Sequence, residues 1–334
     1  MPVLYGSFLN RPLMTYLWTM LSILAIVWRL RSKSCQPALL AYNRLILYWP
    51  AMELARLLRF RLFLDLEDGD VRDVGTRWRG WLARFMKSRF DSLCQSGAML
   101  AASALERQYA GSRFITCYGV ANEEPGQAKD FSGSEELVIH LGGTLQPDTG
   151  AELLLKAIHF LRALSSPPPL RFVVTGVGES SESFKRLSKG AGLPRVEFLG
   201  RVSRAKYLQV LGAAHVGLAL KLQSGQLGDT TFPSKVIEIA SKGMLLVSTC
   251  ISDVPALFGK DGAIYVQEEK PQELAELFVR ISRERHLLDR IASLGKQRVR
   301  EQCSEEAVGQ SLKEFFLADL SVVSGDARTG GSLL

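Results

Sequence analysis

The sequence predicts an α/β protein made of two Rossmann-like domains, the first of them incomplete. Short apolar, β-rich runs alternate with amphipathic segments along most of the chain, a pattern typical of parallel sheets with crossover helices. The length of 334 residues exceeds what one compact core usually holds. With 47% hydrophobic and 22% charged residues, the composition is that of a globular protein and excludes disordered, collagen-like and coiled-coil chains.

The two halves contribute unequal numbers of strands. The first half has four candidate strands, at 38–42, 62–66, 98–102 and 114–118. The second half has six, as expected of a complete nucleotide-binding domain, at 137–141, 171–175, 196–199, 216–220, 245–248 and 263–266. Amphipathic segments at 150–164, 181–190, 204–213 and 234–242 predict the helices that connect the later strands.

The segment 126–136 follows Pro125, is polar, and predicts a linker between the two domains. We therefore expect a partial first domain over 1–125, a second domain over 137–304, a final helix over 305–320 that packs back toward the first domain, and a flexible tail over 321–334. A sheet without its first strands exposes apolar edges. We therefore expect the chain to be an N-terminally truncated form, with a genuinely reduced half-domain as the alternative.

Positive charge is concentrated in the first half. The net charge is +7, and residues 1–125 hold 16 Lys or Arg against 10 Asp or Glu, whereas 126–334 hold 25 against 24. A basic half indicates an anionic partner. No aromatic-basic RNA motif or zinc finger is present, so we expect no nucleic acid and favour an anionic membrane surface.

Two segments of the first half bear on that membrane hypothesis. The run at 13–28 (LMTYLWTMLSILAIVW) has no charge but is shorter than the roughly 20 residues of a bilayer span. We interpret it as a buried domain helix, with an interfacial or re-entrant segment and a true span as alternatives. The segment 77–90 (RWRGWLARFMKSRF) fits a domain helix and a helix on an anionic membrane equally well.

Cysteine and histidine spacing gives no metal or disulfide signal. Five cysteines are widely spaced without a CxxC pair, and the four histidines lie far apart in the sequence. This argues against a disulfide scaffold and a zinc site, and it fits a reducing compartment. We expect a cytoplasmic protein, peripheral on the cytoplasmic face of a membrane if the basic half binds lipid.

Four blocks follow one another in the second half: LGGTLQPDTGAELLLKAI (141–158), FVVTGVGESSESFKRL (172–187), VEFLGRVSRAKYLQVLGAAHVGLAL (196–220) and FPSKVIEIASKGMLLVSTCISDVPAL (232–257). The last block is the most specific, because its Pro-led helix carries a glutamate and is followed by Gly, a strand and a turn. The content and order of the blocks resemble the donor-binding domain of GT-B glycosyltransferases of family 4.

The resemblance implies a site for a nucleotide-sugar donor, with no bound metal and no other cofactor. By analogy Glu238 would bind the ribose hydroxyls, although a glutamate on a helix more often simply faces solvent. Glycines in the first turn would let backbone amides approach a diphosphate, and a helix start with nearby lysines would neutralise it. The expected donor-site residues are Gly142, Gly143, Thr144, Lys221, Pro233, Ser234, Lys235 and Glu238.

The sequence departs from the family pattern at several positions. Thr144 and Thr149 stand where family members often carry an Arg and a Lys. Family members often have a second glutamate eight residues before the one that corresponds to Glu238, where this chain has Thr230. We therefore expect the neighbouring Asp229 to substitute for that glutamate as a catalytic residue.

The first half resembles the later part of the family's acceptor domain. The segment LDLEDGD (64–70) lies where family members often have a short polar catalytic loop. We therefore expect Glu67 and Asp68 to contact the acceptor or act as a base, the alternative being a turn in which the carboxylates cap local N–H groups.

The resemblance as a whole implies a glycosyltransferase. It would move a sugar from a nucleotide-sugar to a glycan or lipid-linked acceptor, with retention, in surface polysaccharide or glycoconjugate synthesis. The alternatives are a truncated gene product, a membrane-associated scaffold and an inactive nucleotide-binding subunit. An NAD-dependent oxidoreductase is disfavoured because LGGTLQPDTG lacks the G-x-G-x-x-G spacing.

Overall fold

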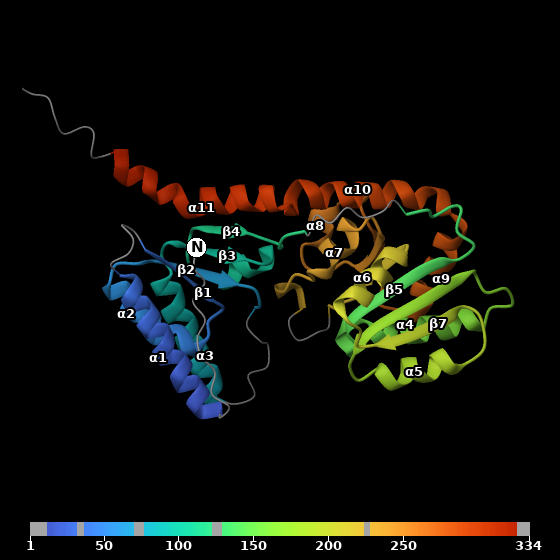
Figure 1. Ribbon diagram of the computed structural model, residues 1–334, viewed down its shortest axis with the longest axis horizontal. Helices are drawn as coiled ribbons and strands as arrows, with labels where there is room; N and C mark the ends of the chain where they lie inside the picture. The colour runs from blue at the N-terminus through green and yellow to red at the C-terminus, as the bar shows by residue number, and fades with distance from the viewer. Residues whose placement is uncertain (1–11, 32–36, 70–76, 122–128, 224–227, 326–334) are drawn as a thin grey trace, which may run out of the picture. The chain divides into compact units, whose positions relative to one another are not determined.

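A computed structural model describes residues 12–31, 37–69, 77–121, 129–223 and 228–325 (Figure 1). The chain divides into two compact units, Met1–Cys117 and Tyr118–Leu334. Both contain a parallel sheet flanked by helices, so the predicted pair of Rossmann-like α/β units is confirmed.

The first unit holds a four-stranded parallel sheet in the order β1-β2-β3-β4. Helices α2 and α3 pack against β2, whose Leu62, Phe63 and Leu64 are buried on both faces, as expected of a central parallel strand. Its elements are α1 (Pro12–Leu30), β1 (Ala38–Tyr42), η1 (Ile46–Tyr48), α2 (Trp49–Leu57), β2 (Arg61–Leu66), α3 (Arg77–Leu93), β3 (Gly97–Leu100), η2 (Ser103–Gln108) and β4 (Phe114–Thr116).

Helix α1 corresponds to the predicted apolar run, but the prediction of a buried helix is wrong for much of its surface. One side packs on α2 and includes the buried Val27. The apolar side chains of the other side are exposed by 44% to 60%; these are Met14, Leu17, Trp18, Leu21 and Trp28. The three helices of the unit lie together beside the sheet (Figure 1, blue to teal), and the main contacts of α1 are with α2 and η1.

The second unit holds a six-stranded parallel sheet in the order β10-β9-β8-β5-β6-β7. Its elements are β5 (Leu137–Thr144), η3 (Pro147–Thr149), α4 (Ala151–Arg162), β6 (Leu170–Val177), α5 (Ser181–Lys189), β7 (Arg195–Gly200), α6 (Arg204–Ala213), β8 (Val216–Ala219), η4 (Gly228–Thr230), α7 (Lys235–Ser241), β9 (Leu245–Thr249), α8 (Val254–Phe258), β10 (Ile264–Val266), α9 (Pro271–Arg283), α10 (Arg285–Cys303) and α11 (Glu305–Gly325).

The strand order of the second unit reverses beside β5, which pairs with β6 on one side and with β8 on the other. In open α/β sheets, ligands bind at such a reversal, outside the carboxyl ends of the strands. The core below that edge is apolar, with Ile139, Leu141, Val174 and Val247 buried between the sheet and its helices. We therefore expect a ligand-binding site at the carboxyl ends of β5 and β8.

The predicted glycine-rich turn after residue 141 is wrong. β5 continues through Gly142 and Gly143 to Thr144, and β6 continues beside it through Gly176. Gly142 pairs with Thr175 and Gly143 with Gly176, so the glycines lie within the sheet. A glycine pair lets two extended strands continue past the point where side chains would collide.

The predicted linker and tail are only partly described. Residues 126–128 and 326–334 lie outside the described residues. Within the rest of the linker, Phe131 is buried and the Lys129 ammonium donates to the carbonyl oxygens of Leu211 and Gly212 at the end of α6. Helix α11 continues past residue 320 to Gly325.

Candidate functional site

A cavity of about 210 Å³ lies at the reversal point of the second sheet. Its walls come from the carboxyl end of β5, the segment after β8, and the start of α7. We call it the switch-point cavity. It is lined by Leu141, Gly142, Thr144, Thr149, Leu218, Ala219, Leu220, Lys221, Phe232, Pro233, Ser234 and Lys235.

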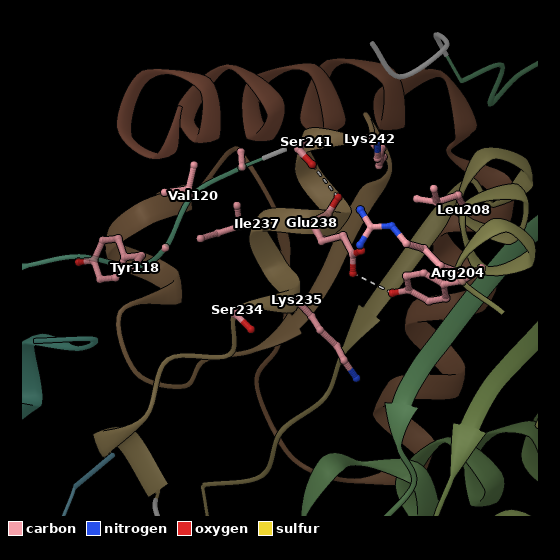
Figure 2. A pocket seen from close by; sticks show the side chains of 13 residues that line it. Tyr118, Val120, Arg204, Leu208, Ser234, Lys235, Ile237, Glu238, Ser241 and Lys242 are labelled. Carbon is pink, nitrogen blue, oxygen red and sulfur yellow. Dashed lines mark hydrogen bonds between the residues drawn. The ribbon is translucent and has the colours of Figure 1, made fainter. Parts of the chain in front are cut away.

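A second pocket, of about 330 Å³, lies along α7 and shares Ser234 and Lys235 with the first. We call it the Glu238 pocket. Figure 2 shows Glu238 at its centre, with Arg204 and Leu208 on one side and Tyr118 and Val120 on the other. Because the two hollows share lining residues, a single ligand could reach both.

The glycines of β5 and β6 make room for Lys235. Gly143 has φ +103°, and a Cβ built on it would overlap the Lys235 ammonium. A Cβ on Gly142 would lie 2.6 Å from Cε1 of His140. Glycine is therefore required at both positions by close approach, and at Gly143 also by its left-handed backbone.

Lys235 is a cation held inside the site. Its ammonium donates a hydrogen bond to the carbonyl oxygen of Gly142, and burial lowers its pKa, an effect that the nearby Glu238 carboxylate partly offsets. A partly buried ammonium loses some of its hydrogen bonds to water, and an anionic ligand can replace these bonds with its own oxygen atoms. The arrangement fits a phosphate-bearing ligand.

Glu238 is held by a neighbour on another helix. The phenol of Tyr207, on α6, donates to Oε2 of Glu238 at 2.7 Å, which is the dashed line at the Glu238 carboxylate in Figure 2. Burial raises the pKa of Tyr207, and the hydrogen bond to Glu238 raises it further. The phenol therefore keeps its proton at neutral pH and remains the donor in this pair.

His140, on β5, packs against Tyr207 and lies close enough to Lys235 to be affected by its charge. It is 3% exposed, and its Nε2 lies 2.9 Å from Oγ1 of Thr175. Burial, together with the charge of Lys235, lowers the pKa of His140 to about 4. The imidazole is neutral at pH 7 and packs edge-on against the Tyr207 ring, with ring centroids 5.8 Å apart.

The structure brings most of the predicted donor-site residues together. Six line the switch-point cavity: Gly142, Thr144, Lys221, Pro233, Ser234 and Lys235. Gly143 lies against Lys235, and Glu238 lines the neighbouring pocket. Their roles in binding remain predictions.

Asp229 takes a different place from the rest. It lies in the short helix η4, and its Oδ1 accepts a hydrogen bond from the backbone N–H of Ser252 at 3.0 Å. That contact ties η4 to the loop after β9, and Asp229 is outside the residues that line the two pockets. Its predicted catalytic role has no geometric support among the described residues.

The start of α7 contributes less backbone than expected. The helix has only seven residues, and the N–H groups of Val236 and Ile237 already donate to the carbonyl oxygens of Pro233 and Ser234. The side chain of Lys235, rather than the helix terminus, therefore dominates the electrostatics of the cavity.

Glu67 and Asp68 lie in the first unit, in the loop after β2. Oδ1 of Asn43 accepts hydrogen bonds from their backbone N–H groups at 2.9 and 3.4 Å, so the loop is shaped by an asparagine after β1. Burial raises the pKa of Asp65, two residues earlier, to about 6, and the Glu67 charge adds to the effect. The loop is an acidic cluster, and its catalytic role remains a prediction.

The sequence interpretation missed Tyr207, His140 and Thr175. His140 and Gly142 are two residues apart in one strand, so alternation could have placed the imidazole on the face of the glycine. Tyr207 and Glu238 are 31 residues apart with no local signal. No group of three or more His, Cys, Asp or Glu in the described part of the chain is arranged to hold a metal ion.

Comparisons with known proteins agree with this fold. Residues 135–284 match the family model described as Glycosyl transferases group 1. A curated relative, the phosphatidylinositol N-acetylglucosaminyltransferase GPI3 subunit of Saccharomyces cerevisiae, is 26% identical over 152 residues, covering 45% of this chain and 32% of the yeast protein. A phosphatidylinositol N-acetylglucosaminyltransferase subunit of Arabidopsis thaliana is 31% identical over 126 residues, covering 37% of this chain and 26% of the plant protein. The match thus spans about a third or less of these relatives.

Solved structures match over nearly the whole chain. Anabaena Alr3699/HepE in complex with UDP has a TM-score of 0.68 at 15% identity, covering 93% of this chain and 85% of that one. Sucrose-phosphate synthase from Thermosynechococcus elongatus has a TM-score of 0.67 at 13% identity, covering 95% and 81%. The chain therefore has the GT-B fold, and its residues 135–284 match the family model of the glycosyl transferases group 1.

Proposed function

We propose that the protein is a glycosyltransferase that moves a sugar from a nucleoside-diphosphate sugar to a glycan or lipid-linked acceptor. The observation that carries the proposal is the half-buried ammonium of Lys235, which donates to the carbonyl oxygen of Gly142 in a cavity at the reversal point of the sheet. A diphosphate in that cavity would receive its counter-charge from this side chain.

The neighbouring Glu238 pocket extends the same argument to the nucleoside. Its carboxylate faces a hollow of about 330 Å³, and a carboxylate can accept hydrogen bonds from two adjacent hydroxyl groups. A ribose diol there would place its diphosphate toward Lys235, because Ser234 and Lys235 line both hollows. Structural neighbours were solved with UDP and with UDP-glucose, which supports a donor of this class.

The chemistry we propose needs no bound metal ion. Lys235 would supply the positive charge that the leaving diphosphate requires, aided by Lys221, which lines the same cavity. We further propose transfer with retention of the anomeric configuration, in surface polysaccharide or glycoconjugate synthesis. Proton NMR of the product anomer tests the stereochemistry, and turnover in EDTA tests the independence from metal.

Thermal unfolding in the presence of UDP, GDP, ADP, CMP and dTDP tests the donor site. A ligand at 100 times its dissociation constant stabilises by about 2.7 kcal/mol, so we expect one nucleotide to raise the melting temperature by several degrees. Glu238→Ala is expected to abolish the rise. The matched control is Glu182→Ala, since Glu182 lies on the exposed face of α5, and it should leave the rise intact.

The outcomes separate the proposal from its rival. If none of these nucleotides stabilises the wild-type chain, the proposed donor site is wrong. If one stabilises it but no nucleotide-sugar is turned over with any acceptor, the protein is a nucleotide-binding subunit without catalytic activity.

A lipid-linked acceptor is supported by the exposed apolar side of α1 and by the activities after which the relatives are named. The yeast and Arabidopsis relatives are named as phosphatidylinositol N-acetylglucosaminyltransferases. In this chain Met14, Leu17, Trp18, Leu21 and Trp28 recur at helical spacing along the exposed side of α1. We propose that this stripe rests on a membrane that presents a lipid-linked acceptor, on its cytoplasmic face.

The end of the stripe has the chemistry of a membrane interface. The Arg31 guanidinium lies 3.7 Å from the Trp28 ring centroid, and aromatic rings with nearby cations are typical of the headgroup region. On α3, Trp81 and Phe85 are exposed and stacked at 5.7 Å, beside the exposed Arg84. Within the described ranges, every helix falls short of the length and apolar character that a bilayer crossing requires, so the contact proposed is peripheral.

Co-sedimentation with phosphatidylcholine vesicles containing phosphatidylserine tests this contact. Leu17→Glu with Leu21→Glu is expected to reduce the bound fraction at least ten-fold, because each leucine would lose about 1.5–3 kcal/mol of burial and each glutamate adds repulsion. Leu164→Glu with Leu287→Glu is the control, since it replaces two exposed leucines of the second unit. Equal loss in both double variants would contradict the assignment to α1.

A further inference from the structure

The phenol of Tyr207 is a half-buried polar group that the proposed function does not yet use. Its O–H donates to Oε2 of Glu238 at 2.7 Å, and Tyr207 lines the same pocket as that carboxylate. The pair joins two helices that come from different parts of the sequence, α6 and α7. The bond therefore fixes one oxygen of the carboxylate while the rest of the group remains available to the pocket.

The Tyr207 ring packs in turn against a residue of the sheet, His140. His140 packs edge-on against it, with ring planes at 62°, and the other end of the imidazole reaches Oγ1 of Thr175 at 2.9 Å. His140 lies on β5 and Thr175 on β6, and both are almost fully buried. A sequence of contacts thus runs from the rigid centre of the sheet, through the imidazole and the phenol, to Glu238.

The remaining groups around Glu238 explain why its orientation needs such support. Arg204 and Lys242 line the same pocket, and Figure 2 shows Arg204 on the side of Glu238 where its carboxylate accepts the hydrogen bond from Tyr207. A glutamate has several side-chain torsions, and nearby cations could draw its carboxylate to more than one position. A single strong donor that is fixed to the sheet selects one of these orientations.

We propose that Tyr207 is a positioning residue that sets the Glu238 carboxylate to read the ribose hydroxyls, and so discriminates ribonucleotides from deoxyribonucleotides. This inference rests on the proposed function, because it requires a nucleotide in the Glu238 pocket. Carboxylate hydrogen bonds are directional and charge-assisted. A Glu238 carboxylate that is free to rotate would form its hydrogen bonds to the ribose hydroxyls for only part of the time.

Tyr207→Phe is the informative variant because it removes one oxygen and leaves the ring on His140. The measurement is calorimetric titration with UDP, GDP and ADP, and with the 2′,3′-dideoxy form of each. For the wild type we expect the ribonucleotide of the bound base to be preferred by at least ten-fold, the typical effect of losing a hydrogen bond to a charged group. In Tyr207→Phe this preference should fall to about two- or three-fold, with the affinity for the dideoxy form unchanged within about two-fold.

Two further variants make the result specific. Tyr265→Phe is the matched control, since the phenol of Tyr265 donates to the carbonyl oxygen of Gly259 at 2.7 Å, outside both pockets. It should leave the preference as in the wild type. Glu238→Gln should lower the preference at least as much as Tyr207→Phe does.

The titrations also separate the failure of this inference from that of the proposed function. A wild-type chain that binds none of the six nucleotides would overturn the proposed function and this inference with it. A wild-type chain that binds with an unchanged preference in Tyr207→Phe would overturn the inference alone. Equal weakening of the ribo and dideoxy forms would do the same, since it would show that Tyr207 only supports the fold.

Discussion

Replacing Lys235 with methionine is expected to reduce affinity for a nucleoside diphosphate about 100-fold, and turnover by at least as much. Methionine keeps most of the volume but removes the positive charge from the switch-point cavity. Charge-assisted hydrogen bonds to phosphate are roughly twice as strong as neutral ones, and burial of the ammonium strengthens them further. Titration of the variant with the nucleotide that stabilises the wild type measures the loss.

The same substitution should leave stability nearly unchanged. Burial lowers the pKa of Lys235, so the charged form of this side chain is disfavoured in the folded state. Methionine removes that penalty but leaves the Gly142 carbonyl oxygen without its donor, at a cost of about 1 kcal/mol or somewhat more. The melting temperature should move by only a few degrees, which separates loss of binding from loss of fold.

Lys185→Met provides the matched control for Lys235. Lys185 lies on α5, is 54% exposed and pairs with Glu182, which is 75% exposed. This variant should bind the nucleotide like the wild type. If Lys235→Met also binds normally, the diphosphate lies elsewhere and the site assignment is wrong.

Gly176→Ala is expected to destabilise the second unit by about 3 kcal/mol or more. Gly176 has φ +120°, and an added Cβ would overlap the carbonyl oxygen of Gly143 and lie 2.7 Å from its carbon. These are backbone atoms of the paired strand, so no side chain can move aside. Strained backbone and steric overlap are among the few causes of such large effects.

Urea unfolding of the variant measures this loss, with Gly309→Ala as the comparison. Gly309 lies in α11 with open space around its Cα, so alanine there should stabilise the helix by about 0.5–1 kcal/mol. A Gly176→Ala variant as stable as the wild type would contradict the paired-glycine geometry of β5 and β6.

The fold is largely predictable because strand and helix periodicities are local. The strand predicted at 38–42 matches β1 to the residue, and the six strands of the second sheet lie within a few residues of their predicted positions. The glycine pair is different, because Gly142 and Gly143 lie in the sheet only through their partners in β6. That pairing brings together residues more than thirty positions apart, which no local window contains.

Helix α1 shows a second limit of sequence patterns. An uncharged run predicts burial, yet the exposed side of α1 carries Trp18 and Leu21. Apolar periodicity identifies the element, but whether a neighbour covers a given face depends on tertiary packing. The structure shows α2 packed against α1, with these side chains left outside the contact.

The site is predictable where its residues share a contiguous block. Pro233, Ser234, Lys235 and Glu238 lie within six residues and follow from one motif. The hydrogen bond from Tyr207 to Glu238 could not be predicted in this way, because it depends on how α6 packs beside α7. Asp229 rests on an offset of one residue in a pattern, and its side chain turns instead to the backbone of Ser252.

The central claim is that a nucleoside diphosphate binds with its phosphates at Lys235 and its ribose at Glu238. The most direct measurement is a crystal structure of the chain with the nucleotide that stabilises it most. We predict phosphate oxygens within hydrogen-bond distance of the Lys235 ammonium, in the cavity lined by Gly142 and Ser234, and ribose hydroxyls on the carboxylate of Glu238. A nucleotide bound elsewhere, or with its ribose away from Glu238, would contradict the account.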